Sequence, residues 1–469
     1  MGLPSVVTII RTAAILVAAV ATLAGSQPQR EPALVIRNVT ILSMASDPGA
    51  GSVVIRDRRI AEVGPTAGRD VSGATVIDGT GKFLIPGLID MHTHVSKTRG
   101  SSLALFVAAG ITTVRDLGGD HEELLRWKAD LNARRRVGPR LLIAGPYLES
   151  ATNAARQHRT PVAEMVEPTE RTRIGVAAPS EAERIVAEIA ARGVDHLKIR
   201  TTQDRETYLA IGAAAKRHGL SLTGHSQPYG FDALFASGQR SIEHAFYPPL
   251  EIAPAERRAA FARMAGAGVA VIPTLVVLER IGIPTDEGLR SIVEAAEHPA
   301  DGKRYLAAFT RADWREQLAE QGPDRRDVYE RARAGAVRDL REMRTAGVRV
   351  LAGTDSGVLN VVPGRALHEE LALLVRDGGM TPLDALKAAT ADAAAFLGLA
   401  DTGTIAAGSR ADVVLLDANP LVDIGSVSRI AGIALGGRWF DRAALKQLVD
   451  AVPSSPDVRT NDWRREMKQ

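Results

Sequence analysis

Two histidines separated by one residue are the first candidates for chemistry in this chain. His92 and His94 lie in the segment GLIDMHTHV, whose apolar start is typical of a buried strand. Because side chains alternate between the two faces of a strand, both imidazoles point to the same face. Two neighbouring imidazoles can bind one divalent ion, but this spacing alone is weak evidence for a metal. The pair therefore needs further ligands before it indicates a metal site.

Lys198 is the second candidate, because lysine is rare here. The chain has nine lysines against 49 arginines, and in HLKIR the apolar Leu197 and Ile199 flank Lys198. If these two face the helices, Lys198 projects to the opposite side of the strand. An unpaired buried ammonium beside metal ions is costly, whereas a lysine that has reacted with CO₂ is an anion able to bridge two cations. A structural lysine paired with a carboxylate is the alternative.

Three more polar residues end apolar segments. His225 follows SLTG, His244 follows SIE, and Asp355 stands in AGTDSG. Each alone is compatible with a hydrogen-bonded histidine or a helix-capping aspartate. Together with the first three they form a group that packing alone has no reason to produce. The chain has no cysteine, so a metal would be held by histidines and carboxylates.

The elements that must position these residues follow the order of a parallel barrel. Residues 87–400 alternate short apolar runs with amphipathic helical stretches, so we predict an α/β fold built on a (β/α)₈ TIM barrel. The candidates then end strands one, four, five, six and eight. Two long connections, 149–179 and 276–345, are expected on the same face, and whether they act as lids is left open. The strands are placed near GLIDMHTHV, TTVRDLG, RLLIAGPYL, HLKIR, SLTGHS, SIEH, VAVIPTL and VRVLAGTD.

Both ends of the chain are rich in short β-branched runs broken by Gly, Asp and Pro. Residues 32–86 and 401–445 are therefore predicted to build one small β-sandwich domain, followed by a polar C-terminal tail, 446–469. A length of 469 residues suits a barrel with such a domain. Apolar residues make up 45% of the chain, which excludes a disordered protein.

The N-terminus has the order of a secretory signal peptide. Residues 1–26 carry Arg11, an apolar run and the small residues Ala24-Gly25-Ser26. We expect export to the periplasm or the medium; an uncleaved anchor is the alternative. After signal cleavage no membrane association is expected, since no later segment reaches about 20 continuous apolar residues. A net charge of +3 gives no reason to expect nucleic acid as a partner.

These motifs jointly resemble the amidohydrolase superfamily, in its imidazolonepropionase-like and Xaa-Pro dipeptidase-like branch. The resemblance spans about 400 residues. It implies two divalent ions, expected to be zinc: His92, His94 and Asp355 bind the first, His225 and His244 the second, and a carboxylated Lys198 bridges them. It also implies a metal-bridging hydroxide, with Asp355 as proton shuttle. It is carried by PGLIDMHTHV, AAGITTVRDLGG, GVDHLKIR, SIEHA, AGTDSG, LHEELALLV, TPLDALKAAT and GTIAAGSRADVVLLDANPL.

The substrate side departs from the pattern of the family. GPYLESATNAARQHR replaces a Gly- and His-rich loop, so His158 in that stretch is only a candidate for a substrate carboxylate. Gln227 is a candidate substrate contact, since it stands where peptide-cleaving relatives often have an aromatic residue or histidine. Tyr229 is a candidate carbonyl donor, with a loop tyrosine of no catalytic role as the alternative. His368 is interpreted as orienting another group or lying on a helix surface, not as a ligand.

The expected activity is hydrolysis of an amide or peptide bond in a small substrate, either a dipeptide or an N-acyl amino acid. An esterase, lactonase or phosphotriesterase on the same metal pair is the alternative, because the same hydroxide attacks all these centres. The alternative of another class is a non-catalytic periplasmic protein that binds a metal or ligand, but its signature would be a missing ligand. A homo-oligomer is left open.

Overall fold

The computed structural model describes residues 32–68, 71–156, 160–244, 252–281, 285–294, 302–320 and 326–452. The predicted signal peptide and His158 lie outside the described residues, so export stays a prediction. Among the helices that can be described, none combines the length and apolar character needed to span a bilayer.

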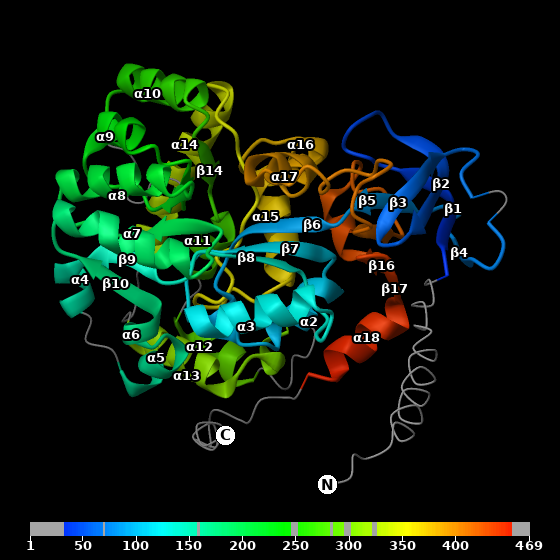
Figure 1. Ribbon diagram of the computed structural model, residues 1–469, viewed down its shortest axis with the longest axis horizontal. Coiled ribbons are helices and arrows are strands. Elements are labelled where there is room, and N and C mark those ends of the chain that lie inside the picture. Colours follow the sequence, from blue (N-terminus) through cyan, green and yellow to red (C-terminus); the bar gives the residue numbers. More distant parts are fainter. Residues whose placement is uncertain are drawn as a thin grey trace, which may run out of the picture.

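Parallel strands form the wall of the main domain (Figure 1). One sheet has the order β6-β7-β8 and the other β10-β9-β11-β12-β13-β14. The strands are buried along nearly their whole length, as a sheet covered by helices requires. Their bounds are β6 (Leu88–Thr93), β7 (Ile111–Asp116), β8 (Arg140–Ile143), β9 (Tyr147–Ser150), β10 (Arg173–Val176), β11 (His196–Ile199), β12 (Ser221–Gly224), β13 (Ser241–Glu243) and β14 (Ala270–Ile272).

Backbone hydrogen bonds bridge both seams between the two sheets. At one seam the Asp195 amide donates to the Ile143 carbonyl at 2.8 Å, which links β8 to the start of β11. At the other, Leu351 N donates to Val271 O at 2.9 Å and Met91 N donates to Ala352 O at 3.0 Å. Residues 349–352 thus stand between β14 and β6, where the eighth strand was predicted. The third predicted strand is divided into β8 and β9.

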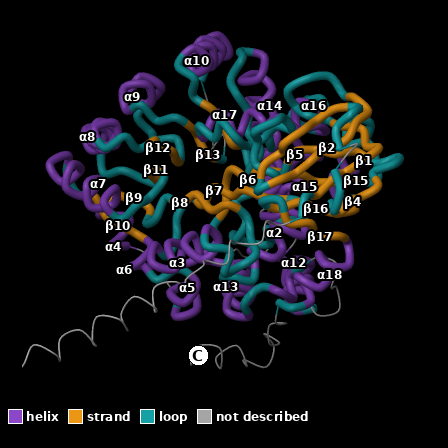
Figure 2. The backbone as a smooth tube through the Cα atoms, turned by 45° about the vertical axis from the view of Figure 1, so that its right-hand side comes forward, coloured by secondary structure: helices purple, strands orange, loops and turns teal. Residues whose placement is uncertain are grey.

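Helices pack around these strands (Figure 2). In α8, Tyr208, Ile211 and Ala215 are buried toward the sheet, and the Asp204 carboxylate caps the first turn by accepting from Thr207 N at 2.7 Å. Its sequence, DRETYLAIGAAAKRHG, belongs to one of the amphipathic helical stretches noted within residues 87–400. The bounds are α1 (Val95–Thr98), α2 (Ser102–Ala108), α3 (His121–Asn132), α7 (Ala182–Ala191), α8 (Arg205–Arg217), α9 (Gly230–Ser237), α10 (Pro254–Gly266), α15 (Arg365–Arg376), α16 (Pro382–Ala388) and α17 (Ala391–Leu397).

The two long connections contain elements of their own and touch each other. Val162 and Val166 of α5 pack against Phe309 and Ala312 of α13, so an apolar contact joins the two insertions. In the first insertion β10 adds a parallel strand beside β9. The elements are α4 (Ala151–Arg156), α5 (Pro161–Val166), α6 (Thr169–Thr172) and β10 in the first, and α11 (Leu275–Ile281), α12 (Thr285–Val293), α13 (Ala308–Glu320) and α14 (Arg326–Thr345) in the second.

Both chain ends build a second, β-rich domain, which lies to one side of the barrel in Figure 1. One connected sheet has the order β17-β16-β15-β5-β1-β2-β3, and β4 also pairs with β1. The antiparallel pair β5·β15 joins the two ends. The helix α18 (Arg442–Asp450) continues into the first residues of the predicted tail. The strands are β1 (Leu34–Ile41), β2 (Gly49–Arg56), β3 (Arg59–Gly64), β4 (Thr75–Asp78), β5 (Phe83–Pro86), β15 (Val413–Leu416), β16 (Ile430–Leu435) and β17 (Arg438–Asp441).

Candidate metal centre

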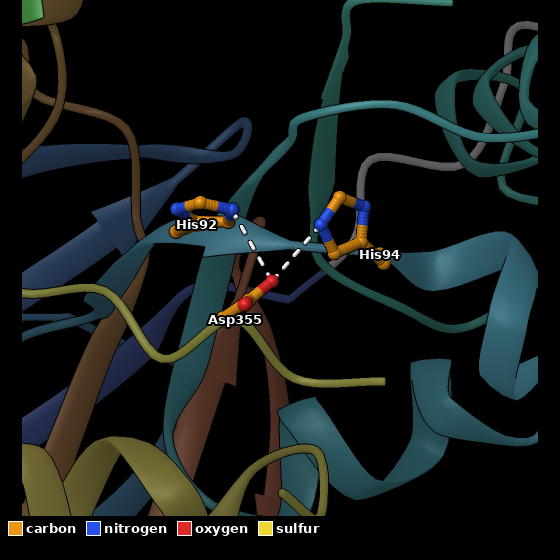
Figure 3. A group of neighbouring side chains, drawn as sticks. All are labelled: His92, His94 and Asp355. Atoms are coloured by element: carbon orange, nitrogen blue, oxygen red, sulfur yellow. Dashed lines mark ion pairs between the residues drawn. The ribbon is translucent and has the colours of Figure 1, made fainter. Parts of the chain in front are cut away.

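Three predicted histidine ligands approach the carboxylate of Asp355. Its Oδ1 lies 2.9 Å from His94 Nε2 and 3.3 Å from His92 Nε2, and its Oδ2 lies 3.8 Å from His244 Nε2. Figure 3 shows the first two rings facing this carboxylate. The ring of His225 lies 5.0 Å from that of His244. The structure thus gathers these five residues from the ends of β6, β12 and β13 and from the segment after residue 352.

Each of the three rings is fixed through its other nitrogen. His92 Nδ1 lies 2.9 Å from Glu243 Oε2, His94 Nδ1 lies 2.8 Å from the Gly118 carbonyl, and His244 Nδ1 lies 2.8 Å from Thr274 Oγ1. Partners of this kind set the orientation of a metal-binding histidine and leave its Nε2 free. The rings are therefore arranged so that all three Nε2 atoms face Asp355.

Lys198 is buried beside the same group. Among the described residues its Nζ has no hydrogen-bond partner, and the charges of Glu243 and Asp355 act on it. Burial lowers its pKa to about 8. The same burial, with Lys198 and His244 nearby, holds the pKa of His225 well below its ordinary value. All six predicted ligands thus belong to one electrostatically coupled group.

The charge states of the group suit a metal site. Burial lowers the pKa of His94 to about 4 and that of His244 to about 3, so both imidazoles are neutral at pH 7. Burial alone would raise the pKa of Asp355, but His92, His244 and His94 hold it well below its usual range. Neutral imidazole and ionised carboxylate are the forms that bind metal.

Glu243 is a central residue that the sequence analysis did not single out. Its Oε1 accepts hydrogen bonds from Arg115 Nη2 at 2.8 Å and from Thr223 Oγ1 at 2.5 Å, while its other oxygen faces His92. Burial would raise its pKa, yet Arg115 and His92 hold it well below the ordinary value. A buried, ionised carboxylate thus stands behind His92. The only sequence signal was its place directly before His244.

The backbone explains how neighbouring residues serve the same site. Adjacent strand residues normally face opposite sides, but His244 has φ 67°, which turns its side chain toward the site that Glu243 also faces. Asp355 (φ 58°) and Thr274 (φ 45°) are also left-handed. For a β-branched threonine this conformation is strained, and such strain concentrates at functional sites. A Cβ on Gly224 would lie 1.9 Å from the Ile199 carbonyl, so only glycine fits before His225.

A cavity of about 410 Å³ opens beside the group. His225, His244 and Asp355 form one part of its wall. The remaining lining contains both polar and apolar residues, which suits a small molecule carrying both kinds of group. Its other lining residues are Arg200, Thr201, Ser226, Glu243, Pro273, Thr274, Val277, Leu278 and Tyr329.

The predicted substrate residues lie next to the cavity, outside its lining. Gln227 Oε1 accepts from Thr202 Oγ1 at 2.9 Å, and Tyr229 donates to the Thr202 carbonyl at 3.2 Å. The two side chains thus tie the loops after β11 and β12 together, and their contact with substrate stays a prediction. His368 is partly buried in α15, and its Nε2 lies 2.8 Å from the Ala109 carbonyl.

Comparisons with known proteins show which family the chain resembles. The sequence pattern of the "Amidohydrolase family" matches residues 83–440. The chain is 24% identical over 424 residues to ochratoxinase of Aspergillus niger, covering 80% of this chain and 78% of the relative. It is 28% identical over 393 residues to imidazolonepropionase of Ralstonia nicotianae, covering 78% and 86%.

Solved structures match over nearly the whole chain. A bottromycin amidohydrolase is 26% identical with a TM-score of 0.68, covering 92% of both chains. A Xaa-Pro dipeptidase with bound methionine in its active site has a TM-score of 0.63 at 20% identity, covering 87% of this chain and 100% of that one. The latter is a likeness of fold alone.

Proposed function

Because the chain belongs to the amidohydrolase family, as its motifs predicted and as the match over residues 83–440 shows, we propose that it hydrolyses an amide or peptide bond of a small substrate. The proposed substrates are dipeptides and N-acyl amino acids. One observation carries the proposal: three imidazole Nε2 atoms converge on the Asp355 carboxylate at the wall of a cavity of about 410 Å³. The relative named amidohydrolase, at 26% identity, supports the choice of bond.

The side chains fit two divalent ions. His92, His94 and Asp355, whose ligand atoms all lie within 4.8 Å of one another, would hold one ion. His225 and His244 would hold the other. The buried Nζ of Lys198, for which the described residues offer no hydrogen-bond partner, would become an anion shared by both. We propose zinc, because neutral imidazole and carboxylate suit this ion.

Carboxylation of Lys198 is chemically consistent with its surroundings. A neutral amine attacks CO₂, a C–N bond forms, and one proton leaves to give the carbamate. Burial lowers the pKa of Lys198 to about 8, which raises the fraction of neutral amine near neutrality. The product replaces an unpaired buried ammonium by an anion.

The ions, when bound, supply electrophilic activation of the substrate carbonyl and a lowered pKa for a bound water. The chain supplies the rest. Glu243 and Thr274 hold the rings of His92 and His244 in place. Asp355, kept ionised by His92 and His244, accepts the proton of the attacking water on Oδ2 and delivers it to the leaving nitrogen.

Metal analysis and a substrate panel test the proposal. Purified protein should contain about two zinc ions per chain. The zinc-loaded enzyme should cleave leucyl-phenylalanine, leucyl-proline or N-benzoyl-L-phenylalanine faster than phenyl acetate and paraoxon. Less than half an ion per chain would contradict the metal centre. Faster cleavage of phenyl acetate or paraoxon would mean that the enzyme acts on an ester or a phosphotriester instead of an amide.

We also propose that residues 1–26 direct export, on the strength of their charge and apolar pattern. N-terminal sequencing of protein recovered from the periplasm or medium should find a start close to Gln27. Protein retained in the cytoplasm with Met1 intact would contradict export.

A further inference from the structure

Arg200 is a charged side chain at the cavity that hydrolysis itself does not use. It follows β11, two residues after Lys198, and lines the cavity with His225 and Asp355. Its side chain is 35% exposed, whereas that of its partner Glu149 is fully buried. A partly exposed arginine at the cavity is thus held by a fully buried carboxylate.

The hydrogen bonds of Arg200 leave donors available. Its Nη1 donates to Glu149 Oε1 at 2.9 Å, and in the described part of the chain this is the one side-chain acceptor of the guanidinium. An arginine has five N–H donors, and their fork geometry matches a carboxylate. Since Arg200 lines the cavity and its side chain is 35% exposed, its remaining donors are available to a ligand there.

The charges behind Arg200 also favour an anion. Arg173 donates to Glu149 Oε1 at 2.7 Å and to Glu167 Oε2 at 2.9 Å, and Lys97 Nζ lies 3.2 Å from Glu167 Oε1. Among the described residues, three cations in this largely buried cluster thus share two carboxylates. A negatively charged ligand group beside Arg200 would balance the cluster.

Apolar residues also line the cavity. Pro273, Val277 and Leu278 line it, and Tyr329 of α14 adds an aromatic ring. A molecule that carries both a carboxylate and an apolar group matches a lining that contains both an arginine and apolar side chains.

We propose that Arg200 binds the free carboxylate of the substrate, and that the substrate class is an N-acyl amino acid or dipeptide with a free C-terminal carboxylate and an apolar group. This inference rests on the proposed function and adds to it the residue that selects the substrate. Arginine is suited to the task because its planar guanidinium pairs with a carboxylate through two parallel hydrogen bonds.

A matched pair of substrates tests the role of Arg200. N-benzoyl-L-phenylalanine and N-benzoyl-L-phenylalaninamide differ only in the charge of one end, and benzoate release reports the same bond in both. The wild-type enzyme should prefer the acid by roughly 10- to 100-fold in kcat/KM, mainly through KM. Arg200→Gln should bring this ratio close to one while preserving turnover of the amide. Arg184→Gln, in an arginine of α7 that is 64% exposed, is the control and should leave the ratio unchanged.

Each other outcome has a defined meaning. If the kcat/KM values of wild type for the two compounds lie within threefold, Arg200 does not select the carboxylate. The same holds if Arg200→Gln lowers kcat/KM equally for both compounds. If neither compound is cleaved, the proposed function fails for this substrate class, and calorimetry with 3-phenylpropionate and 3-phenylpropionamide tests the selection by itself. The acid should then bind wild type about tenfold more tightly than Arg200→Gln. Equal binding would overturn the inference, because a carboxylate held by metal alone is insensitive to this substitution.

Discussion

The two halves of the candidate metal centre are built differently. The half around His92 and His94 is buried, and its rings are fixed by the ionised Glu243 and by a backbone carbonyl. The half around His225 and His244 borders the cavity; the side chain of His244 is 25% exposed and is fixed by a neutral hydroxyl. This difference suggests that the first half holds its geometry by itself, whereas the second depends on a modified Lys198.

Asp355 touches both halves, so its replacement should have the largest effect. Asp355→Asn keeps the shape but removes the proton acceptor and one charge between His94 and His244. We expect kcat to fall by about 10²- to 10⁴-fold. Steady-state kinetics on the best substrate of the panel measures this. Asp232→Asn, at a carboxylate that is 82% exposed, is the control. Activity within tenfold of wild type would remove Asp355 from proton transfer.

Lys198→Ala tests the asymmetry directly. It should leave the His92, His94 and Asp355 half able to bind, so zinc should drop from about two ions per chain to about one, with kcat reduced about 100-fold or more. Formate or acetate, which restore a small anion, should recover part of the activity. Lys446→Ala, at a lysine that is 74% exposed, should change neither value. Loss of both ions at once would show that the two halves are equally dependent on Lys198.

The anchors of the two halves should differ in strength. Glu243→Gln removes an ionised partner of His92 and should lower zinc affinity about 10- to 100-fold. Thr274→Ala removes one neutral hydrogen bond to His244, worth about 1 kcal/mol, and should lower it about fivefold. Competition with a chelator measures both affinities, and thermal unfolding checks that each variant folds. A larger loss in Thr274→Ala would reverse the comparison.

The sequence could predict that these candidate ligands gather in one place, because regular geometry brings them together. Alternation along a strand puts His92 and His94 on one face, and parallel strands bring their ends to the same face of the barrel. Glu243 could not be recognised in this way, since alternation places it opposite His244. Only the left-handed backbone of His244 brings both to the site.

The substrate side depended on contacts between distant segments. Arg200 became a candidate only through its ion pair with Glu149, which Arg173 also contacts. Arg173 belongs to an insertion whose β10 has no counterpart in the predicted strand order. Gln227 and Tyr229 were singled out by their distance from His225, but their polar atoms are engaged by the neighbouring loop. Local spacing thus predicted which candidate ligands gather better than it predicted the contacts of the candidate substrate residues.

The smallest effect on activity is expected from replacing Glu370, which contacts the start of α11 close to Thr274. Its Oε2 accepts a hydrogen bond from Val276 N at 2.8 Å at the start of α11, directly after Thr274. The carboxyl is fully buried, and burial raises its pKa from 4.5 to about 8 despite the backbone hydrogen bonds. It is therefore protonated in the folded protein at neutral pH and ionised in the unfolded chain.

The sign of the pH effect follows from this difference. Since the folded protein holds the proton more tightly, the contribution of Glu370 to the free energy of unfolding is fully present below about pH 4.5 and is lost as the pH rises through about 8. Glu370→Gln cannot ionise, so its melting temperature should fall less than that of wild type between pH 5 and pH 9, with kcat at pH 7 changed less than threefold. Glu188→Gln, at a carboxylate that is 52% exposed, should follow the wild-type curve. Parallel curves for Glu370→Gln and wild type would mean that Glu370 does not retain its proton when folded. An ionised carboxylate would then support the segment around Thr274. The contrast between the charged anchor of His92, Glu243, and the neutral anchor of His244, Thr274, would weaken.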